Sequence, residues 1–337
     1  MMRAAWIAER GPASSIRVSE VPVPTLEAGE LFVRVEAAAV DPVDTLVRSG
    51  RYATPIPFPF IVGRDLVGTV EAVAPDAAGF APGDRVWCNS LGHAGRQGVT
   101  AEYACVPADR AYPLMPQVDA VRAVSLLHPL ATAHLALFTH GGLTPNRSAG
   151  DAASSGATQT VVVAGGAGNV GSALVALASE AGARVIATAS ATDASYVAGL
   201  GATAVVDYRS TDWLEHIVRL TPEGASVSID TSGSVGIEWA LSAARPRGRI
   251  VVLAGFGQTF PLPVGALYTR DITITGFAIS TASVAELAAA AGTVNRILVD
   301  TDFSARRVET VGLADVARVH EQIERRQAGS TRFVVIP

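Results

Sequence analysis

The sequence predicts an α/β protein in which a β-rich part is followed by a doubly wound parallel sheet. Three observations predict this fold class: the length of 337 residues, short extended segments that fill the first 120 residues, and a regular alternation of strand-like and helix-like segments after residue 158. A chain of this length exceeds the size at which one hydrophobic core keeps growing, so two domains are expected.

The first 120 residues consist of short β-favouring runs separated by proline and glycine. The patterns of LFVRVEAAAV, LVGTVEAVA and TAEYACVP predict strands, and stretches rich in proline or glycine, such as ATPIPFPF and APGD, lie between them. From Ala120 the pattern becomes helical, through AVRAVSLLHPLATAHLALFTH, and a polar loop follows from Thr144 to Thr158. We assign no function to this loop.

Six strand-like segments then alternate with helical ones, from TVVVA to ITITGF. Strands joined by helices form a parallel sheet with helices on both faces. ITITGF would lie at the edge of that sheet, and an exposed edge needs covering. Pairing with a second copy of the chain would cover it, so we predict a homodimer. A helix in VAELAAAAGTVNRIL and a final helix and strand complete the chain.

Composition excludes several functions. The net charge is −5 and 17% of residues are charged, which gives no basic surface for nucleic acid. The first residues lack the apolar core of a signal peptide, and no uninterrupted apolar run approaches the roughly 18 residues of a membrane span. We therefore expect a soluble cytoplasmic protein. All 26 basic side chains are arginine, so Schiff-base lysine chemistry and a Tyr/Lys proton relay are excluded.

A glycine-rich turn is the strongest motif. Gly166, Gly168 and Gly171 form a G-x-G-x-x-G with Asn169 and Val170, directly after a strand and directly before a helix. The glycines allow a tight turn, close approach of a pyrophosphate and close helix–strand packing. The helix amino terminus then offers unpaired N–H groups to the phosphates. We interpret the turn as a dinucleotide-binding site.

The end of the next strand, RVIATAS, distinguishes the two nicotinamide dinucleotides. An NAD site would place an acid here for the ribose hydroxyls, whereas this chain has Ala189 and Ser190. The first acid, Asp193, is more simply a helix-start residue. With no carboxylate to repel a 2′-phosphate, NADP is favoured over NAD.

The ordered series VDPVDTLVRSGRY, PFIVGRDLVGTVEAV, LATAHLAL, AGGAGNVG, LGATAVVDYR, IDTSG and GFAI resembles the medium-chain dehydrogenase/reductase superfamily. More narrowly, it resembles the zinc-independent quinone oxidoreductase branch that includes zeta-crystallin. The resemblance implies a GroES-like catalytic domain, a Rossmann domain that holds NADPH, and a homodimer. It implies domain boundaries of 1–125 for the GroES-like domain, 126–278 for the Rossmann domain and 279–337 for a return segment that completes the first.

The zinc-containing alcohol dehydrogenases are the other large branch, and their ligands are missing here. Their cysteine position falls near Ala39 or Val40, and their Gly-His-Glu reads Gly63-Arg64-Asp65. Two cysteines cannot form a four-cysteine structural site, and the six histidines show no HxH or HExxH spacing. We expect a metal-free enzyme in which Arg64 and Asp65 pair structurally.

The resemblance also implies site residues. Tyr52 is the best candidate for a proton or hydrogen-bond donor, although packing against the proline-rich segment explains it equally well. Asp41 either bonds the substrate or the nicotinamide ribose, or only starts a turn. Positions implied for the cofactor are Thr132 at the nicotinamide; Gly166, Gly168, Asn169, Val170 and Gly171 at the pyrophosphate; Ser190, Tyr208 and Arg326 near the 2′-phosphate; and Phe277 and Ile279 beside the nicotinamide. The lysine that the family has shortly after Ser190 is absent, and Arg209 could substitute for it.

The function implied is NADPH-dependent hydride transfer to quinones or other conjugated carbonyls, such as enones and 2-enals. An enoyl-thioester reductase on the same scaffold is an alternative. A non-catalytic NADPH-binding protein, crystallin-like or redox-sensing, is an alternative of another class.

Overall fold

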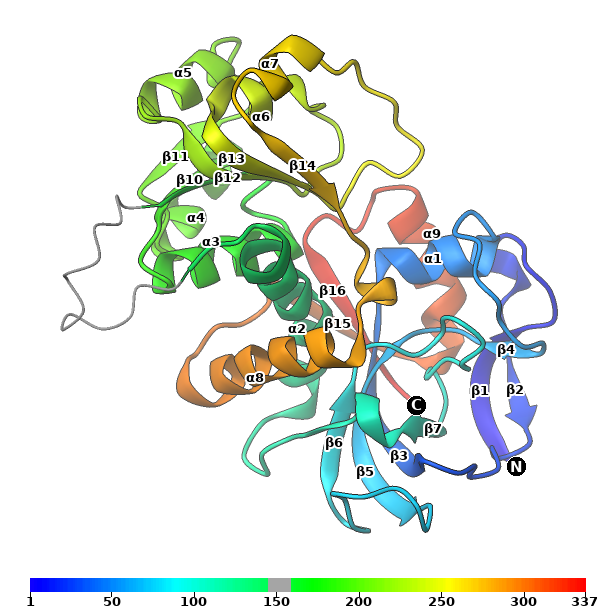
Figure 1. Cartoon of the computed structure of the whole chain (residues 1–337). Coiled ribbons are helices and arrows are strands. Elements are labelled where there is room, and N and C mark those ends of the chain that lie inside the picture. Colours follow the sequence, from blue (N-terminus) through cyan, green and yellow to red (C-terminus); the bar gives the residue numbers. More distant parts are fainter. Residues whose placement is uncertain (145–158) are drawn as a thin grey trace. The chain divides into compact units, whose positions relative to one another are not determined.

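The computed structural model of this chain describes residues 1–144 and 159–337 (Figure 1). It divides into two compact units, Met1–Ala131 with Ser283–Pro337, and Thr132–Ala282. The sequence resemblance implies boundaries at 125/126 and 278/279, and these stay predictions. The first division is hard to place from sequence because a single helix runs across it. Residues 145–158 of the polar loop lie outside the described part of the chain.

The first unit is built on a sheet in the order β15-β16-β3-β5-β6-β8, with β7 also paired to β3, and on a smaller sheet in the order β2-β1-β4. Its strands are β1 Met2–Ile7, β2 Arg17–Val21, β3 Glu30–Val40, β4 Phe60–Ile61, β5 Asp65–Val73, β6 Arg85–Cys88, β7 Tyr103–Pro107, β8 Tyr112–Pro113, β15 Arg307–Gly312 and β16 Thr331–Ile336. Both ends of the chain therefore contribute to one domain.

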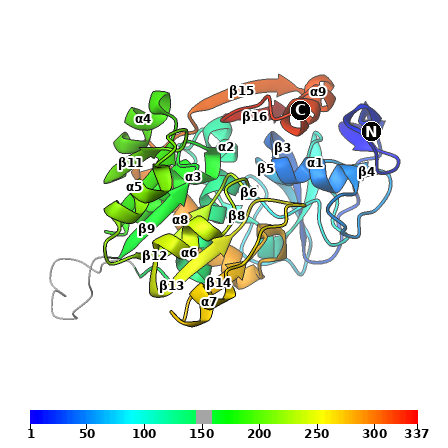
Figure 2. The same ribbon diagram turned by 90° about the horizontal axis from the view of Figure 1, so that it is seen from above.

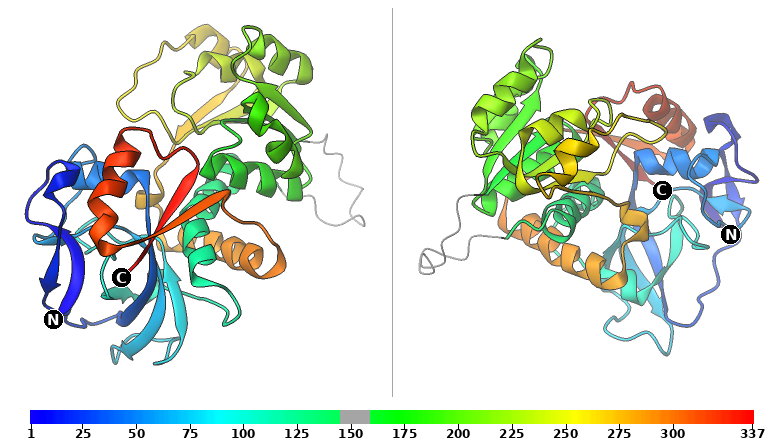
Figure 3. Two further views of the ribbon diagram at one scale, coloured as in Figure 1. Left: turned by 180° about the vertical axis from the view of Figure 1, so that it is seen from behind. Right: turned by 45° about the horizontal axis from the view of Figure 1, so that its top comes forward.

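Strand β3 joins these parts. Its 11 residues pair with β5 and β7 along most of their length, and at its carboxyl end the last strand of the chain, β16, lies antiparallel to it, with Val334 opposite Ala39. Figure 3 shows the red β16 beside the blue and cyan strands. Alternate β3 side chains such as Leu31 and Val33 lie in the core. The return segment thus completes the amino-terminal sheet.

Four α-helices accompany this unit. They are α1 Pro42–Ser49, α2 Ala120–His134, α8 Val284–Asp300 and α9 Val316–Glu324. The first begins directly after β3, with Pro42 at its first position and Gly50 in the left-handed conformation at its end.

One helix is long and apolar enough to span a membrane by length and composition. It combines α2 with the π-helical turn η3, Leu135–His140, and 78% of its most apolar window is buried inside the structure. This burial identifies it as a core helix.

The second unit contains a six-stranded parallel sheet in the order β11-β10-β9-β12-β13-β14 (Figure 2). The elements after η3 are β9 Thr160–Ala164, α3 Asn169–Glu180, β10 Arg184–Ala189, η4 Ala191–Asp193, α4 Ala194–Gly199, β11 Ala204–Asp207, α5 Trp213–Leu220, β12 Ala225–Asp230, α6 Glu238–Ala243, β13 Ala244–Val252, α7 Val264–Tyr268, β14 Thr273–Gly276 and η5 Ile279–Thr281. The order in which successive strands are added to the sheet reverses between β9 and β12, and ligands bind at such a switch point in folds of this kind. The predicted doubly wound sheet is confirmed.

Candidate functional site

The glycine-rich turn lies between β9 and α3, where the sequence placed it. Gly166 N–H donates to the Thr188 carbonyl at 2.8 Å, and Gly168 N–H donates to the Gly165 carbonyl at 3.1 Å. Gly168 is the N-cap of α3 and, being glycine, has no side chain that could cap the helix. The first helical hydrogen bond runs from the Ser172 N–H to the Gly168 carbonyl, at 2.8 Å. The first-turn N–H groups are therefore left for an external acceptor.

Two of the glycines are required by close packing. A Cβ atom on Gly171 would lie 2.0 Å from the Gly165 carbonyl oxygen, and one on Gly166 would lie 2.9 Å from the Ala187 Cβ. Because the first obstacle is backbone, no side chain fits at position 171 without displacing the turn. The turn and the uncapped helix start fit the pyrophosphate of a dinucleotide.

The carboxyl ends of β10 and β11 bring together the residues expected near the 2′-phosphate. Ala189 pairs with Asp207, so Ser190 and Tyr208 follow at neighbouring strand ends, and the Arg209 guanidinium lies 5.7 Å from the centre of the Tyr208 ring. Tyr208 and Arg209 are exposed. Arg326 belongs to the other unit and is also exposed, with a left-handed φ of 57°.

Asp193 stands at the N-cap of α4 but makes no capping hydrogen bond. Its carboxylate instead accepts from the Ser190 hydroxyl at 2.8 Å. An acid therefore lies beside the strand end that the sequence alone leaves acid-free. Its charge opposes a 2′-phosphate, whereas the charge of Arg209 favours one.

Three further cofactor candidates belong to the second unit. The Phe277 ring stacks on His140 with centroids 4.4 Å apart, and Ile279, at the start of η5, is buried. Thr132 is also buried, and its hydroxyl oxygen has no hydrogen-bond partner among the described residues. A buried hydroxyl left in this way is consistent with a ligand contact.

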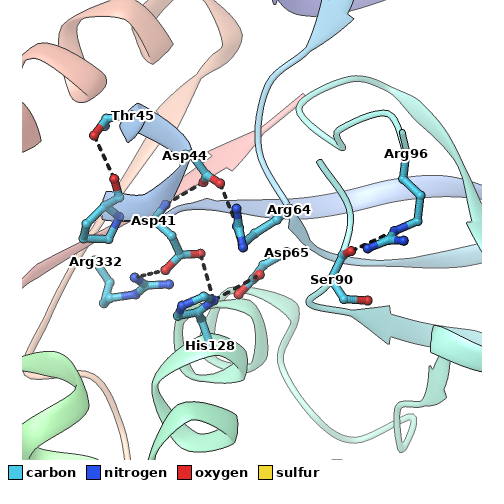
Figure 4. A network of polar contacts seen from close by, with 10 residues as sticks. Asp41, Asp44, Thr45, Arg64, Asp65, Ser90, Arg96, His128 and Arg332 are labelled. Atoms are coloured by element: carbon cyan, nitrogen blue, oxygen red, sulfur yellow. Dashed lines mark hydrogen bonds and ion pairs between the residues drawn. The ribbon is translucent and has the colours of Figure 1, made fainter. Parts of the chain in front are cut away.

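A network of buried charges occupies the first unit (Figure 4). Its members come from distant parts of the chain: Asp41 and Asp44 from the start of α1, Arg64 and Asp65 from the start of β5, His128 from α2 and Arg332 from β16. All are fully or almost fully buried except His128, whose side chain is 13% exposed.

Two ion pairs organise this network. Arg332 donates to one oxygen of Asp41 at 2.7 Å and to the Ser125 carbonyl at 3.0 Å. Arg64 donates to Asp44 at 2.9 Å. The other Asp44 oxygen accepts from the Asp41 N–H at 2.8 Å, which fixes the first turn of α1. The expected pairing of Arg64 with Asp65 is wrong, because the Arg64 side chain reaches across to α1.

Asp65 lies beside His128 instead. The Nδ1 atom of His128 is 3.8 Å from Asp65 Oδ1 and 3.9 Å from Asp41 Oδ2. Burial of Asp65 and repulsion from Asp41 raise the pKa of Asp65 to about 7. Burial also acts to raise the pKa of Asp41, but the charges of Arg332 and His128 outweigh it and lower that pKa to about 2. Burial disfavours a charged His128, yet the two carboxylates raise its pKa overall.

These three side chains bring ligand atoms within 4.8 Å of one another, so the residues need testing as a zinc site. One Asp41 oxygen is already bound by Arg332, and Arg64 and Arg332 place two fixed positive charges in the same buried space. The sulfur and multiple imidazole ligands that zinc prefers are absent from the group. The residues present do not fit a catalytic zinc ion.

The two catalytic candidates from the sequence are placed differently. Tyr52 is half-buried and stacks on His93, with ring centroids 5.7 Å apart. Asp41 is completely buried beneath Arg332, which favours a positioning role over direct contact with a substrate. Both assignments stay predictions.

Sequence reasoning missed His128, Asp44 and Arg332. The available signal for His128 was its position four residues before Thr132, which places the two side chains one turn apart on one side of a helix.

Comparison with known proteins gives consistent matches. Residues 169–311 match the family of zinc-binding dehydrogenases, and residues 27–117 match the alcohol dehydrogenase GroES-like domain. A chloroplastic quinone-oxidoreductase homolog of Spinacia oleracea is 30% identical over 232 residues, which covers 68% of this chain and 67% of that protein.

Two solved structures cover all of this chain and are covered completely by it. One is described as an NAD-dependent alcohol dehydrogenase, with 28% identity and a TM-score of 0.84. The other is a mycobacterial protein complexed with NADPH, with 27% identity and a TM-score of 0.83.

Loss of the Asp41–Arg332 pair should destabilise the first unit strongly. We expect Arg332→Met to lower the free energy of unfolding by about 3–5 kcal/mol, because it leaves a buried carboxylate unpaired. Adding Asp41→Asn should restore part of the loss. Urea unfolding followed by tryptophan fluorescence measures both. Arg318→Met is the matched control, since Arg318 pairs with Glu309 on the surface of the same unit. Equal losses in the Arg332 and Arg318 variants would contradict a structural role for the buried pair.

Proposed function

Because this chain belongs to the medium-chain dehydrogenase/reductase superfamily, we propose that it is an NADPH-dependent, zinc-independent reductase of quinones or other conjugated carbonyls. It is a nicotinamide-dependent oxidoreductase related to quinone oxidoreductases. The observation that carries the proposal is the glycine turn before α3, whose packing excludes side chains and whose helix start is uncapped. The residues of the buried network do not fit a zinc ion, which supports a reaction that uses no zinc.

When bound, the cofactor supplies a hydride from its nicotinamide ring. The first turn of α3 would bind the pyrophosphate, and Ser190, Tyr208 and Arg209 would contact the adenosine end of the cofactor. Phe277, Ile279 and Thr132 would position the nicotinamide. Hydride addition to a conjugated carbonyl leaves negative charge on oxygen, so the protein must supply a hydrogen-bond or proton donor. Arginine donates hydrogen bonds but does not release a proton.

Turnover with a panel of acceptors tests the function. We expect the protein to oxidise NADPH in the presence of a quinone series, an enone series, or both, and the ratio of kcat/KM values identifies the preferred class. Absence of NADPH oxidation with every acceptor would contradict the proposed enzyme. Cofactor binding by fluorescence without any turnover would instead support the non-catalytic alternative.

Arg209 should determine the preference for NADPH. We expect Arg209→Gln to raise KM for NADPH by about tenfold, because an exposed charge-assisted contact to the 2′-phosphate is lost. The KM for NADH should not change. Arg219→Gln, at an exposed arginine on α5 that pairs with Asp212, is the matched control. If the ratio of the KM for NADPH to the KM for NADH is unchanged in Arg209→Gln, Arg209 does not contact the 2′-phosphate.

We also propose that the chain forms a homodimer through β14. This strand pairs only with β13 in the described part of the chain, and the adjacent α7 exposes Val264 and Tyr268. An open strand edge beside exposed apolar side chains suits a symmetric partner. Light scattering at micromolar concentration should give a dimeric mass, and Val264→Asp with Tyr268→Arg should give a monomeric one. A monomeric mass for the unmodified protein would contradict the proposal.

A further inference from the structure

His128 lies between two buried carboxylates whose facing atoms have no other partner. Asp41 Oδ2, both oxygens of Asp65 and the Nδ1 atom of His128 lack a hydrogen-bond partner among the described residues. Unpartnered carboxylate oxygens are costly to bury. Nδ1 of His128 lies 3.8 Å from Asp65 Oδ1 and 3.9 Å from Asp41 Oδ2, between the two acids (Figure 4). A proton held on this imidazole would therefore compensate both acids.

Charge balance points to the same proton. Three carboxylates, on Asp41, Asp44 and Asp65, face two guanidinium groups, on Arg64 and Arg332. With every acid ionised, this cluster carries one excess negative charge. One proton on His128 neutralises it, and buried clusters are most stable when their charges are compensated. A divalent metal ion would instead leave an excess positive charge.

Of the three facing side chains, the His128 side chain is the one that is partly exposed. Asp41 and Asp65 are completely buried, whereas the His128 side chain is 13% exposed. The carboxylates face Nδ1, so Nε2 lies on the opposite side of the ring. His128 precedes Thr132 by one turn of α2, and Thr132 is the residue proposed at the nicotinamide.

We propose that His128 is the proton donor of the reduction and that Asp65 and Asp41 are its positioning residues. This proposal rests on the proposed function. The hydride carries two electrons to the substrate carbon, and the carbonyl π electrons move to oxygen. That oxygen takes the Nε2 proton, and neutral His128 then recovers a proton from water. The sum is NADPH, one proton and substrate giving NADP⁺ and the reduced substrate.

The electrostatics fix the expected pH dependence. Burial acts to lower the pKa of His128, as does the charge of Arg64, but the carboxylates of Asp41 and Asp65 outweigh both and raise that pKa above its ordinary value of 6.5. Arg332, from β16, pairs with Asp41. The imidazolium should thus persist to higher pH than in an ordinary histidine and be lost as the pH rises further. Histidine donates this proton from its imidazolium form, so kcat should fall as the pH rises through the His128 pKa.

Replacement of His128 by glutamine tests the assignment. We expect His128→Gln to lower kcat by about 100-fold or more, to remove the alkaline fall of kcat, and to leave the KM for NADPH unchanged. Asp65→Asn should keep the fall but move it to lower pH. Retention of kcat and of its alkaline fall in His128→Gln would overturn the proposal.

Two variants serve as controls. His134→Gln removes another histidine of α2, and Tyr52→Phe removes the donor that the sequence favoured. Both should keep the alkaline fall of kcat. Its disappearance in Tyr52→Phe with retention in His128→Gln would assign the proton to Tyr52.

A readout without substrate separates this proposal from the proposed function. In ¹⁵N-histidine NMR, the His128 signal, identified by its loss in His128→Gln, should titrate with a pKa above the ordinary value of 6.5. A His128 that loses its proton at a pH below that value would overturn the proposal even if NADPH is oxidised. An imidazolium in a protein that oxidises no NADPH would overturn the proposed function and the donor role together. A stoichiometric metal ion by elemental analysis that is lost in His128→Gln would also overturn the proton donor.

Discussion

The ion pair between Asp41 and Arg332 links the end of β3, the start of α1 and the last strand of the chain. Asp41 closes the first turn of α1 through its N–H and holds Arg332 through its side chain. Arg332 in turn fixes the Ser125 carbonyl on α2, one turn before His128. Removal of either partner would leave the other as an unpaired buried charge. The position of His128 therefore depends on this pair.

Proton chemistry in this unit is constrained by the side chains that the chain uses. Every basic residue other than histidine is an arginine, and a guanidinium stays charged at any ordinary pH. Arg64 and Arg332 consequently supply fixed charge and cannot exchange protons. Among the other groups of the cluster, the pKa values of Asp44 and His128 are raised, and that of Asp65 is raised to about 7. We propose that His128 carries the proton used in the reaction. The second unit has the complementary role in the proposed function, since its glycine turn would bind the cofactor that supplies the hydride.

Local patterns made the α/β part predictable. Each strand, and the turn from Gly166 to Gly171, depends on a short run of consecutive residues that can be recognised in the sequence. The structure confirms the six-stranded sheet. The buried network was not predictable in the same way, because Asp41 and Arg332 are 291 residues apart in sequence. Arg64 and Asp65 are adjacent and both lie in the buried network, but their hydrogen-bonding and ion-pair partners come from elsewhere in the chain: Arg64 pairs with Asp44, and Asp65 lies beside His128. The sequence shows Asp193 three residues after Ser190. That its carboxylate accepts from the Ser190 hydroxyl depends on the conformation of η4, which the sequence does not give.

The division of the first unit between the two ends of the chain has a consequence for biosynthesis. The second unit is continuous, so Thr132–Ala282 can fold while the rest of the chain is still being translated. The sheet of the first unit lacks β16 until residue 336 has left the ribosome. Until then Asp41 has no Arg332, and the proton-bearing cluster cannot assemble. Thr132–Ala282 could therefore fold before the buried network of the first unit forms.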